Sequence, residues 1–475
     1  MANNTDKQSR DSNAKLVVFK TSQNAALGAT VIRVNRSVAV FEFFDPSCVL
    51  RLSEVLKDFQ ISLGERTIFQ GQATIQSLVD TGLAVVCEVS LMGLWSDVDF
   101  ETEGDGLRGE FAKQIGQWKK SYMVLPEYKI LAADLHIFLT DFRQWMNQVE
   151  FGINGSPAAD RLQLEQRWAD QLSLAVFPYL DEMFAKLEQI TAKLDADQHP
   201  AHSAYIRRLI QPLVIGAPFA FRAIRKPLGY AGDYEVVDMI LRNPYEGGSL
   251  YAKVLNHWFI KQPPAEAHRN RIKYLTQRLL EETARTMADG RKARVYNLGC
   301  GPAREIQDFM AEQHVSDHAH FTLLDFNEET LRHAQKVLEQ SRKRSGRNTV
   351  LKFTKKSVAQ VLKGRNRASD QPPEDQYDFI YCAGLFDYLS QSACKHLMNV
   401  FYELLAPGGL LVATNVDSSN PIQHWLGDVL EWHLIYRGNK EMLALRPDQA
   451  NLDDTRVVAD ITGVNIFLEV RKPLA

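Results

Sequence analysis

The chain has 475 residues, of which 45% are hydrophobic and 24% charged, and its formal net charge is −3. This length predicts two or three domains, and the near-neutral charge gives no support for nucleic-acid binding. No apolar run approaches the ~20 residues that span a membrane, and residues 1–8 lack the apolar core of a secretory signal. These features exclude a membrane-spanning protein and leave enzymes and binding proteins open.

The cysteines are few and odd in number, and their spacing does not suggest metal ligands. They are Cys48, Cys87, Cys300, Cys382 and Cys394. We therefore expect free thiols in a reducing cytoplasm and no metal site. Cys300 and Cys382 fall near the predicted cofactor site described below, where we expect small apolar wall residues rather than nucleophiles.

The N-terminal third has a β pattern. Residues 1–14 are polar and predict a disordered tail. Residues 15–105 hold short segments rich in β-branched and aromatic residues, separated by turn residues, at 16–20, 29–43, 59–63, 67–79 and 83–89. Five or six strands at this spacing predict a small β-barrel.

Residues 29–43, Ala-Thr-Val-Ile-Arg-Val-Asn-Arg-Ser-Val-Ala-Val-Phe-Glu-Phe, resemble the core of a PilZ domain, a barrel that binds cyclic di-GMP. PilZ domains bind this ligand through an Arg-x-x-x-Arg arm and an Asp-x-Ser-x-x-Gly strand. Here the matching strand reads Asn35-Arg-Ser-Val-Ala, and no paired-arginine arm precedes it. We therefore expect Arg33 and Arg36 to be solvated, and the barrel to serve packing or regulation without cyclic di-GMP.

Residues 106–215 change to a helical period. Segments 128–151 and 159–194 carry apolar residues at helical spacing, and the glycine-rich segment 152–157 joins them, which predicts an antiparallel helical hairpin. The predicted apolar face of the second helix comprises Leu172, Leu174, Val176, Phe177, Leu180, Met183, Phe184 and Leu187. Such a hairpin forms either a homodimer surface or a scaffold between the barrel and the last domain.

Residues 216–290 contain an unusual aromatic and basic segment, Phe219-Ala-Phe-Arg-Ala-Ile-Arg-Lys-Pro-Leu-Gly-Tyr-Ala-Gly-Asp-Tyr-Glu. Gly229 and Gly232 permit a backbone bend, from which we expect Tyr230, Asp233 and Tyr234 to project before a helix that begins at Val236. Because aromatic faces attract cationic ligands, this segment predicts a lid over a binding site. The alternative is a structural linker with hydrogen-bonded tyrosines.

Residues 293–305, Ala-Arg-Val-Tyr-Asn-Leu-Gly-Cys-Gly-Pro-Ala-Arg-Glu, predict a strand, a turn of small residues and a helix. This arrangement lets a ligand approach the backbone closely. Asp325 ends the next apolar run, 321–325, about 20 residues further on, where a carboxylate binds a ribose diol in nucleotide-binding folds. The pattern predicts a site for NAD or S-adenosylmethionine, with a purely structural turn as the alternative.

Three features favour S-adenosylmethionine. The third glycine of the pyrophosphate fingerprint is missing, Pro302 removes a backbone N–H that a phosphate would need, and the chain ends in a predicted hairpin at 460–470, split at Gly463, rather than in a second mononucleotide half. Residues 297–303, Asn-Leu-Gly-Cys-Gly-Pro-Ala, resemble motif I of class I S-adenosylmethionine-dependent methyltransferases. Pro-Gly-Gly at 407–409, before the fifth predicted strand, is recurrent in that class.

The predicted cofactor site follows from this resemblance and from the carboxyl ends of the predicted strands. Its residues are Asn297, Gly299, Cys300, Gly301, Ala303, Asp325, Phe326, Ser357, Val358, Cys382, Ala383, Gly384 and Phe386. Arg269 or Arg271, on the helix before the first strand, would pair with the methionyl carboxylate, and we favour Arg271; a surface charge is the alternative.

Residues 423–437 predict an aromatic helix after the fifth strand, in the position where this fold carries substrate-recognition elements. The apolar face of this helix either packs in the core or forms an apolar pocket with a polar end. The residues that would form this pocket are His424, Trp425, Trp432, Tyr436 and Arg437.

Segments 226–235, 297–303 and 431–437 together resemble bacterial methyltransferases of extracellular-factor (3-hydroxypalmitic acid methyl ester) biosynthesis, over the chain from about residue 30 to the end. The resemblance implies a multi-domain chain with a PilZ-like barrel (15–105), a helical middle region (106–215), a lid with its following helices (216–290) and an α/β Rossmann-like class I methyltransferase domain (291–475). It also implies methyl transfer to the carboxylate of a 3-hydroxy fatty acid, which gives a methyl ester quorum-sensing signal.

A carboxylate acceptor needs no general base, because its pKa near ~4 leaves it ionised at neutral pH. Arg437, or Arg222 or Arg225 of the lid, would hold one carboxylate oxygen, and Tyr230 would donate a hydrogen bond or face the sulfonium. The expected catalytic residues are Tyr230, Asp233 and Arg437, and the expected substrate-binding residues are Tyr234, Asn415, His424, Trp432 and Tyr436. Methylation of an amine or a protein side chain, and a non-catalytic module that senses the cofactor, remain alternatives.

Overall fold

The computed structural model describes residues 15–21, 26–34, 37–43, 50–51, 53–63, 66–80, 85–95, 115–116, 122–155, 157–363 and 376–474. The chain forms two compact units, one of Met1–Val124 with Leu194–Ala201 and one of Leu125–Lys193 with His202–Ala475. The predicted tail 1–14 and Arg36 lie outside the described residues. Within them, no helix is both long and apolar enough to cross a membrane.

The first unit contains the predicted small barrel, which is confirmed as six antiparallel strands. They are β1 (Lys15–Lys20), β2 (Ala26–Val34), β3 (Val38–Phe43), β4 (Val55–Leu63), β5 (Arg66–Asp80) and β6 (Val85–Trp95). Their order is β1-β2-β3-β6-β5-β4, and pairing of β1 with β4 closes the barrel. Packed phenylalanine rings occupy the interior, with Phe19 and Phe41 centroids 5.2 Å apart and Phe41 and Phe59 centroids 5.6 Å apart. Arg33 is exposed and pairs with Glu88 at 3.4 Å, as expected for a solvated charge.

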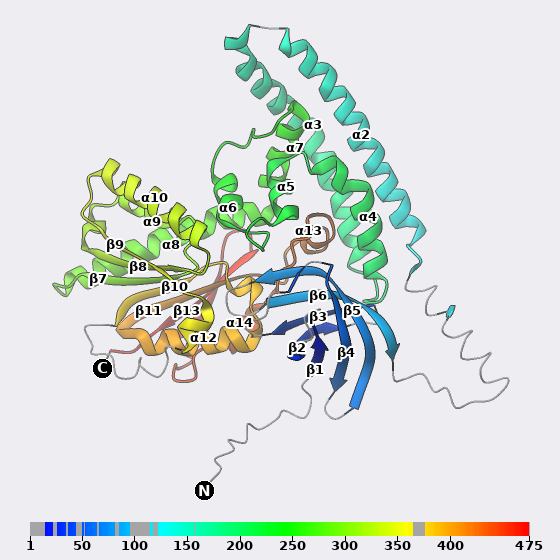
Figure 1. The fold of residues 1–475 in the computed structure, drawn as a ribbon. Coiled ribbons are helices and arrows are strands. Elements are labelled where there is room, and N and C mark those ends of the chain that lie inside the picture. Colours follow the sequence, from blue (N-terminus) through cyan, green and yellow to red (C-terminus); the bar gives the residue numbers. More distant parts are fainter. Residues whose placement is uncertain are drawn as a thin grey trace. The chain divides into compact units, whose positions relative to one another are not determined.

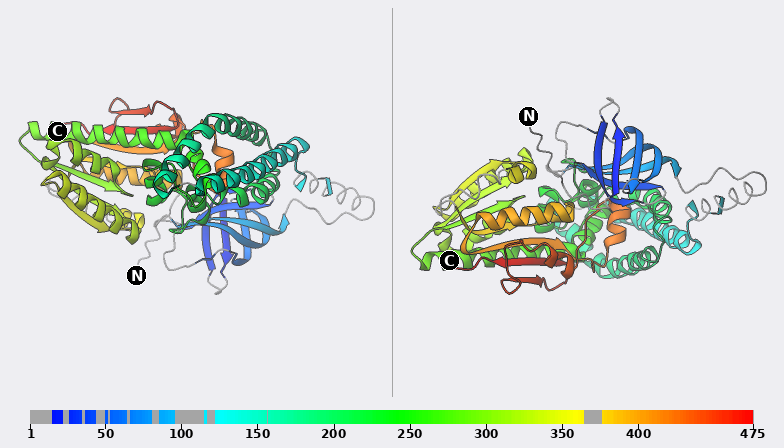
Figure 2. Two further views of the ribbon diagram at one scale, coloured as in Figure 1. Left: turned by 90° about the horizontal axis from the view of Figure 1, so that it is seen from above. Right: turned by 90° about the horizontal axis from the view of Figure 1, so that it is seen from below.

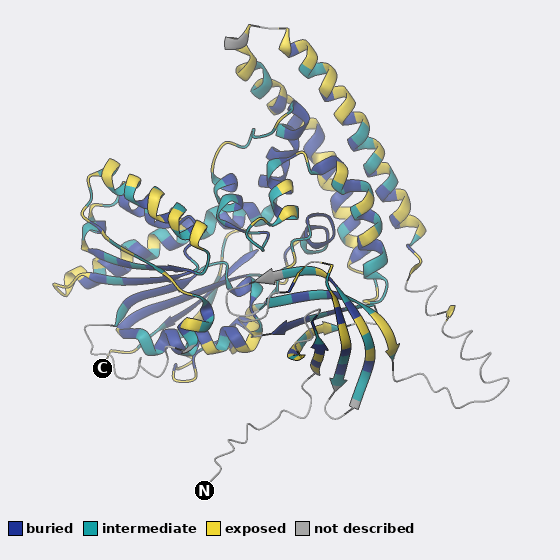
Figure 3. Cartoon of the chain, in the orientation of Figure 1, coloured by how far each residue is buried: buried dark blue, intermediate teal, exposed yellow. Residues whose placement is uncertain are grey.

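The second unit begins with the predicted helical hairpin, α2 (Pro126–Asn154) and α3 (Ala158–Thr191), followed by α4 (His199–Val214). Buried residues recur at helical spacing on α2, from Tyr128 through Leu135 to Phe142. The predicted face of α3 is correct except at Leu174, which is 74% exposed. Figure 3 shows that the two helices are largely exposed toward the hairpin's tip.

The C-terminal part is a seven-stranded α/β sheet, as predicted. Its strands are β7 (Ala293–Leu298), β8 (Ala319–Asp325), β9 (Val350–Lys355), β10 (Tyr377–Cys382), β11 (Leu405–Val416), β12 (Thr455–Ala459) and β13 (Asn465–Arg471). The order is β12-β13-β11-β10-β7-β8-β9 (Figure 1). Strands β7 to β11 are parallel and the terminal hairpin strand β13 is antiparallel to β11. The strand order reverses between β7 and β10, so the carboxyl ends of these strands frame a ligand crevice.

Helices cover both faces of this sheet. Helices α8 (Pro263–Ala288), α9 (Arg304–Glu312) and α10 (Glu328–Ser345) lie on one face, and α12 (Gln391–Leu404) lies on the other (Figures 1 and 2). The predicted inner face of α9 is confirmed, because Ile306, Phe309 and Met310 are fully buried in the sheet's core. This core fixes the start of α9, and therefore the glycine turn before it, at the end of β7.

Shorter helices surround the carboxyl edge of the sheet: α5 (Pro218–Arg225), α6 (Tyr234–Leu241), α7 (Leu250–Ile260), α11 (Val358–Lys363), α13 (Gln423–Leu430) and α14 (Asn439–Ala444). The aromatic helix predicted over residues 423–437 is helical in the structure only over its first half. Helix α13 ends at Leu430, since Glu431 takes a left-handed conformation (φ 53°) and residues 431–438 leave the helix axis. This bend returns Trp432 toward the sheet edge.

Candidate active site

The glycine turn after β7 is held against the end of the neighbouring strand β8. The backbone N–H groups of Gly299 and Cys300 donate to the carbonyl oxygen of Leu324, at 2.8 and 3.1 Å. Gly299 and Gly301 have φ values of +73° and +52°, a conformation that L side chains rarely adopt. A Cβ at Gly301 would point into open space, so the turn leaves room for a ligand beside its backbone.

Asp325 closes the same edge from the end of β8. Its carboxylate is 3% exposed and accepts hydrogen bonds from the backbone N–H of Asn327 at 2.9 Å and of Gly301 at 3.4 Å. Burial raises its pKa to about 6. A carboxylate has about four lone-pair positions, so these contacts leave acceptor capacity for a hydroxyl of the ligand. The turn and Asp325 thus fit the ribose end of the predicted cofactor.

Within the predicted lid segment 219–235, the loop 226–233 joins α5 to α6. Arg222 at the end of α5 donates from Nε to both carboxylate oxygens of Asp233, at 2.7 and 2.9 Å, and so closes the base of this loop. The expectation that Asp233 projects from the loop is wrong. Its side chain is fully buried and caps α6, where it accepts from the N–H groups of Glu235 and Val236. Asp233 therefore shapes the lid and has no free oxygen face for catalysis.

The middle of the lid lies over the sheet edge. The Tyr230 ring centroid is 5.8 Å from that of Phe326, directly after Asp325, and 6.0 Å from that of Tyr388. Burial and the nearby Asp325 raise the pKa of Tyr230, so its hydroxyl is a neutral donor. Tyr230 thus packs beside the strand end that carries Asp325 and does not line the apolar pocket described next.

Gly232 brings the lid into direct contact with this edge. A Cβ built there would lie 2.7 Å from Tyr388 Oη and 2.8 Å from Trp432 Cζ2. Replacing Gly232 with Val should displace the lid, at a cost of about 1–3 kcal/mol, and raise the KM for S-adenosylmethionine by roughly 5–150-fold. Gly248→Ala, where a Cβ meets no atom within 4 Å, is the control. If the KM for S-adenosylmethionine is unchanged in Gly232→Val, the lid does not contribute to cofactor binding.

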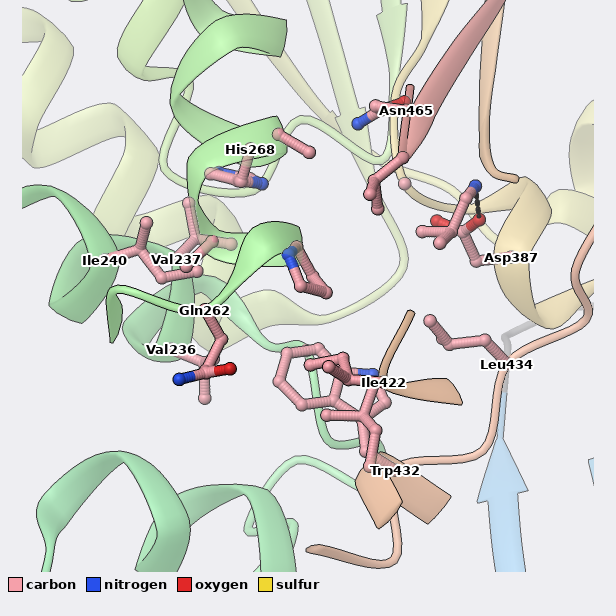
Figure 4. A pocket seen from close by; sticks show the side chains of 18 of the residues that line it. Val236, Val237, Ile240, Gln262, His268, Asp387, Ile422, Trp432, Leu434 and Asn465 are labelled. Atoms are coloured by element: carbon pink, nitrogen blue, oxygen red, sulfur yellow. Dashed lines mark hydrogen bonds between the residues drawn. The ribbon is translucent and has the colours of Figure 1, made fainter. Parts of the chain in front are cut away.

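A pocket of about 100 Å³ opens beside the cofactor edge and is lined mainly by apolar side chains of α6, α8, α13 and the segment after α13. Figure 4 shows Ile422, Trp432 and Leu434 toward one end, and His268, Asn465 and Asp387 toward the other. Of the predicted substrate-binding residues, Trp432 lines this pocket, and its indole N–H donates to Tyr388 Oη at 3.0 Å.

Arg271 of α8 joins the pocket to the cofactor edge. It lines the pocket beside Gly384, where a Cβ would meet its guanidinium at 3.2 Å. Among the described residues it forms no ion pair within 4 Å, and its hydrogen bond goes to His268 Nδ1 at 2.7 Å. Arg269, the other predicted arginine, is instead occupied by Glu266 and the carbonyl oxygens of Ile240 and Ile260. Arg271 is thus the cation available to a ligand carboxylate.

Asp387 is a pocket residue that the sequence analysis missed. Its carboxylate accepts from the N–H of Val416 at 2.7 Å, and burial raises its pKa to about 6 against the opposing effect of Arg271 and Arg437. Asp387 directly follows Phe386, the last residue of the stretch 382–386 that was expected to face the cofactor. That position was the available signal.

The expectation that Arg437 holds a substrate carboxylate is wrong. Its guanidinium is buried and donates to Gln391 Oε1 at 2.8 Å, to Asn415 Oδ1 and the Phe386 carbonyl at 2.7 Å each, and to the Leu389 carbonyl. Asn415 is equally occupied, because its amide N–H groups donate to the carbonyls of Val416 and Ile435. These two residues fasten the segment after α13 to the sheet edge.

Three further expected substrate residues lie away from the pocket lining. Tyr234 stacks on His333 at 4.4 Å and donates to Glu329 Oε1 at 2.8 Å, so it joins α6 to α10. The backbone N–H of His424 donates to the carboxylate of Glu188 on α3, which caps the start of α13. Tyr436 does not line the pocket either.

Of the other predicted cofactor residues, some lie at the carboxyl edge of the sheet and others are buried in the core. Ala383 and Gly384 follow β10 at the crevice, whereas Phe386 is fully buried in the core. Ser357 caps α11 through Gln360, with Val358 buried behind it. Asn297 is buried and donates to Glu305 at 3.4 Å, and Ala303 starts α9 in a left-handed conformation.

The thiols of Cys300 and Cys382 are buried, and burial raises the pKa of both well above the usual range. This agrees with wall residues rather than nucleophiles. Within the part of the chain that is described, no group of His, Cys, Asp and Glu side chains has the arrangement of a metal site.

Comparison with known proteins gives one family match, in which residues 296–411 match the model described as a methyltransferase domain. A search of curated proteins yields no match. Among solved structures, a possible exported protein from Bordetella parapertussis is 18% identical, covering 54% of this chain and 86% of that one, with a TM-score of 0.40. The N-methyltransferase NodS from Bradyrhizobium japonicum WM9, in complex with S-adenosyl-L-homocysteine, is 14% identical (50% and 98% covered, TM-score 0.30).

Magnesium protoporphyrin IX methyltransferase from Synechocystis PCC 6803, with bound S-adenosylmethionine, is 11% identical, covering 49% of this chain and 89% of that one, with a TM-score of 0.31. These structural similarities are too low to add to the assignment. The family match assigns residues 296–411 to a methyltransferase domain, and the strand order and the Asp325–glycine edge agree with that assignment.

Proposed function

We propose that this enzyme methylates the carboxylate of an acid with a long apolar chain, with 3-hydroxy fatty acids as the preferred acceptors and a diffusible methyl ester signal as the product. The observation that carries the proposal is the apolar pocket that meets the cofactor edge at Arg271 and Gly384. The 3-hydroxyl group and the signalling role come from the resemblance of segments 226–235, 297–303 and 431–437 to the extracellular-factor methyltransferases.

The proposed reaction requires little from the protein beyond placing the acceptor carboxylate against the methyl group. Bound S-adenosylmethionine supplies an electrophilic methyl group, which the ionised acceptor takes without losing a proton. The pocket's apolar walls, among them Trp432 and Ile422, remove water from the acceptor carboxylate, which makes it more reactive. The lid, which packs through Tyr230 against Tyr388 of the sheet edge, holds the two reactants in line and away from solvent.

Purified enzyme should transfer label from methyl-labelled S-adenosylmethionine into the organic extract when given free 3-hydroxy fatty acids. A pocket of fixed size favours one chain length, since each buried methylene adds about 0.8 kcal/mol until the pocket is full. We therefore expect kcat/KM to rise about threefold or more per methylene to an optimum and then to fall. Absence of transfer at every chain length, with S-adenosyl-L-homocysteine still bound in calorimetry, would discard the acid acceptor but retain the methyltransferase.

Asp387 supports a second candidate, methylation of a hydroxyl or amine. Such acceptors must lose a proton, and a buried carboxylate in the acceptor pocket with a pKa of about 6 is suited to take it.

The direction of the pH dependence separates the two candidates. At saturating cofactor, which removes the effect of Asp325 titration, a carboxylate acceptor should lose about tenfold in kcat/KM between pH 5.5 and 7.5, because Asp387 becomes a second anion beside it. A hydroxyl or amine acceptor would instead gain rate as Asp387 ionises. Asp387→Asn should flatten either profile, and a wild-type profile that rises through pH 6 would contradict the carboxylate proposal.

A further inference from the structure

Two buried polar side chains of the pocket lack hydrogen-bond partners for one of their atoms, within the residues described. His268 on α8 is 9% exposed, and its Nε2 atom is unpaired. Asn465 at the start of β13 is 3% exposed, and its Oδ1 atom is unpaired. Leaving such a group unsatisfied costs about 1–3 kcal/mol. Both residues line the polar end of the acceptor pocket (Figure 4), where a ligand group would remove that cost.

The contact with Arg271 fixes which proton His268 carries. Arg271 Nη2 lies 2.7 Å from His268 Nδ1, and a guanidinium can only donate, so Nδ1 is the acceptor. Burial, together with the charges of Arg271 and Arg269, lowers the pKa of His268 well below its ordinary value. The ring is therefore neutral, and its single proton lies on Nε2.

The polar end thus offers a neutral donor, His268 Nε2–H, and a neutral acceptor, Asn465 Oδ1. A hydroxyl group is the small substituent that has a complement to each of these atoms, because it accepts one hydrogen bond and donates another. A ketone satisfies only the donor, and a methylene satisfies neither.

We propose that His268 and Asn465 recognise a hydroxyl group of the acceptor and so select hydroxy acids over unsubstituted acids of the same length. They are specificity-determining residues that act on a part of the acceptor distinct from the reacting carboxylate. This inference rests on the proposed function, and it assigns to named side chains a selectivity that the apolar walls of the pocket do not provide.

The test compares kcat/KM for three acids of equal chain length, with a 3-hydroxyl, a 3-keto group or no substituent. A site that hydrogen-bonds a hydroxyl rejects its deoxy analogue strongly, so the wild type should prefer the hydroxy acid over the unsubstituted acid by roughly 100-fold or more, with the keto acid between them. Asn465→Leu should reduce this preference to within about tenfold. Leu434→Ala, in the apolar wall, should lower kcat/KM for all three acids alike and leave the preference intact.

Wild-type enzyme that methylates the hydroxy and unsubstituted acids equally well would overturn this inference while the proposed function stands, and this readout needs no variant to fold. The inference is also overturned if a folded Asn465→Leu, with unchanged affinity for S-adenosyl-L-homocysteine, retains the full preference. Methylation of no acid at all would overturn the proposed function, and this inference with it.

Discussion

Asp325→Ala should weaken binding of S-adenosyl-L-homocysteine by about 10²–10⁴-fold. The carboxylate is the predicted acceptor for both ribose hydroxyls, and hydrogen bonds to a charged group contribute about 1.5–3 kcal/mol each. The same oxygens hold the N–H groups of Gly301 and Asn327, so the variant also loosens the glycine turn that borders the ligand. Isothermal titration calorimetry measures the affinity directly.

A matched control is Asp308→Ala on α9. Asp308 is a partly exposed carboxylate that pairs with Arg304 at 2.8 Å, away from the turn, and its loss should leave the affinity within about twofold, since exposed ion pairs contribute ~0–1 kcal/mol. If Asp325→Ala stays folded by circular dichroism and binds within about threefold of the wild type, the ribose assignment is wrong.

Arg271→Met should weaken the binding of S-adenosyl-L-homocysteine by about 10–150-fold and leave the binding of 5′-methylthioadenosine almost unchanged. The first ligand carries the amino-acid carboxylate and the second lacks it, so their affinity ratio isolates one charge-assisted contact worth about 1.5–3 kcal/mol. Arg271 is the predicted partner because it lies beside Gly384 at the crevice without an ion-paired carboxylate among the described residues.

Arg269→Met is the control for a nearby positive charge. Its guanidinium is occupied by Glu266 and two backbone carbonyls, so both ligands should respond alike. If the ratio of the affinities for S-adenosyl-L-homocysteine and 5′-methylthioadenosine is unchanged in Arg271→Met while the KM for the acid rises, Arg271 binds the acceptor and not the cofactor.

The fold could be predicted because its signals are local. Alternating strands, the small-residue turn at 299–303 and the aspartate at the end of β8 each lie within a short window, and the structure has the barrel, hairpin and sheet where these patterns indicated. The strand order follows from the same sequence of elements, because parallel connections allow few alternatives.

The pocket could not be predicted in the same way, because its polar end is assembled from distant elements. His268 comes from α8, Asp387 from the segment after β10 and Asn465 from β13, and no short window contains two of them. Arg437 was misinterpreted for the converse reason: a charged residue in an aromatic segment resembles a site, while its four hydrogen-bond acceptors become visible only in three dimensions. Asp233 did carry a local signal, since an aspartate directly before a helix is a preferred N-cap.

The most direct test of carboxyl methylation is the chemical stability of the transferred label. Enzyme, methyl-labelled S-adenosylmethionine and a long-chain 3-hydroxy acid are incubated, and the extracted product is treated with mild alkali. We predict that the label is released as volatile methanol, because a methyl ester is hydrolysed under these conditions. Label that stays with the acyl chain after alkali would show methylation of the hydroxyl or another nucleophile and would contradict the proposed reaction.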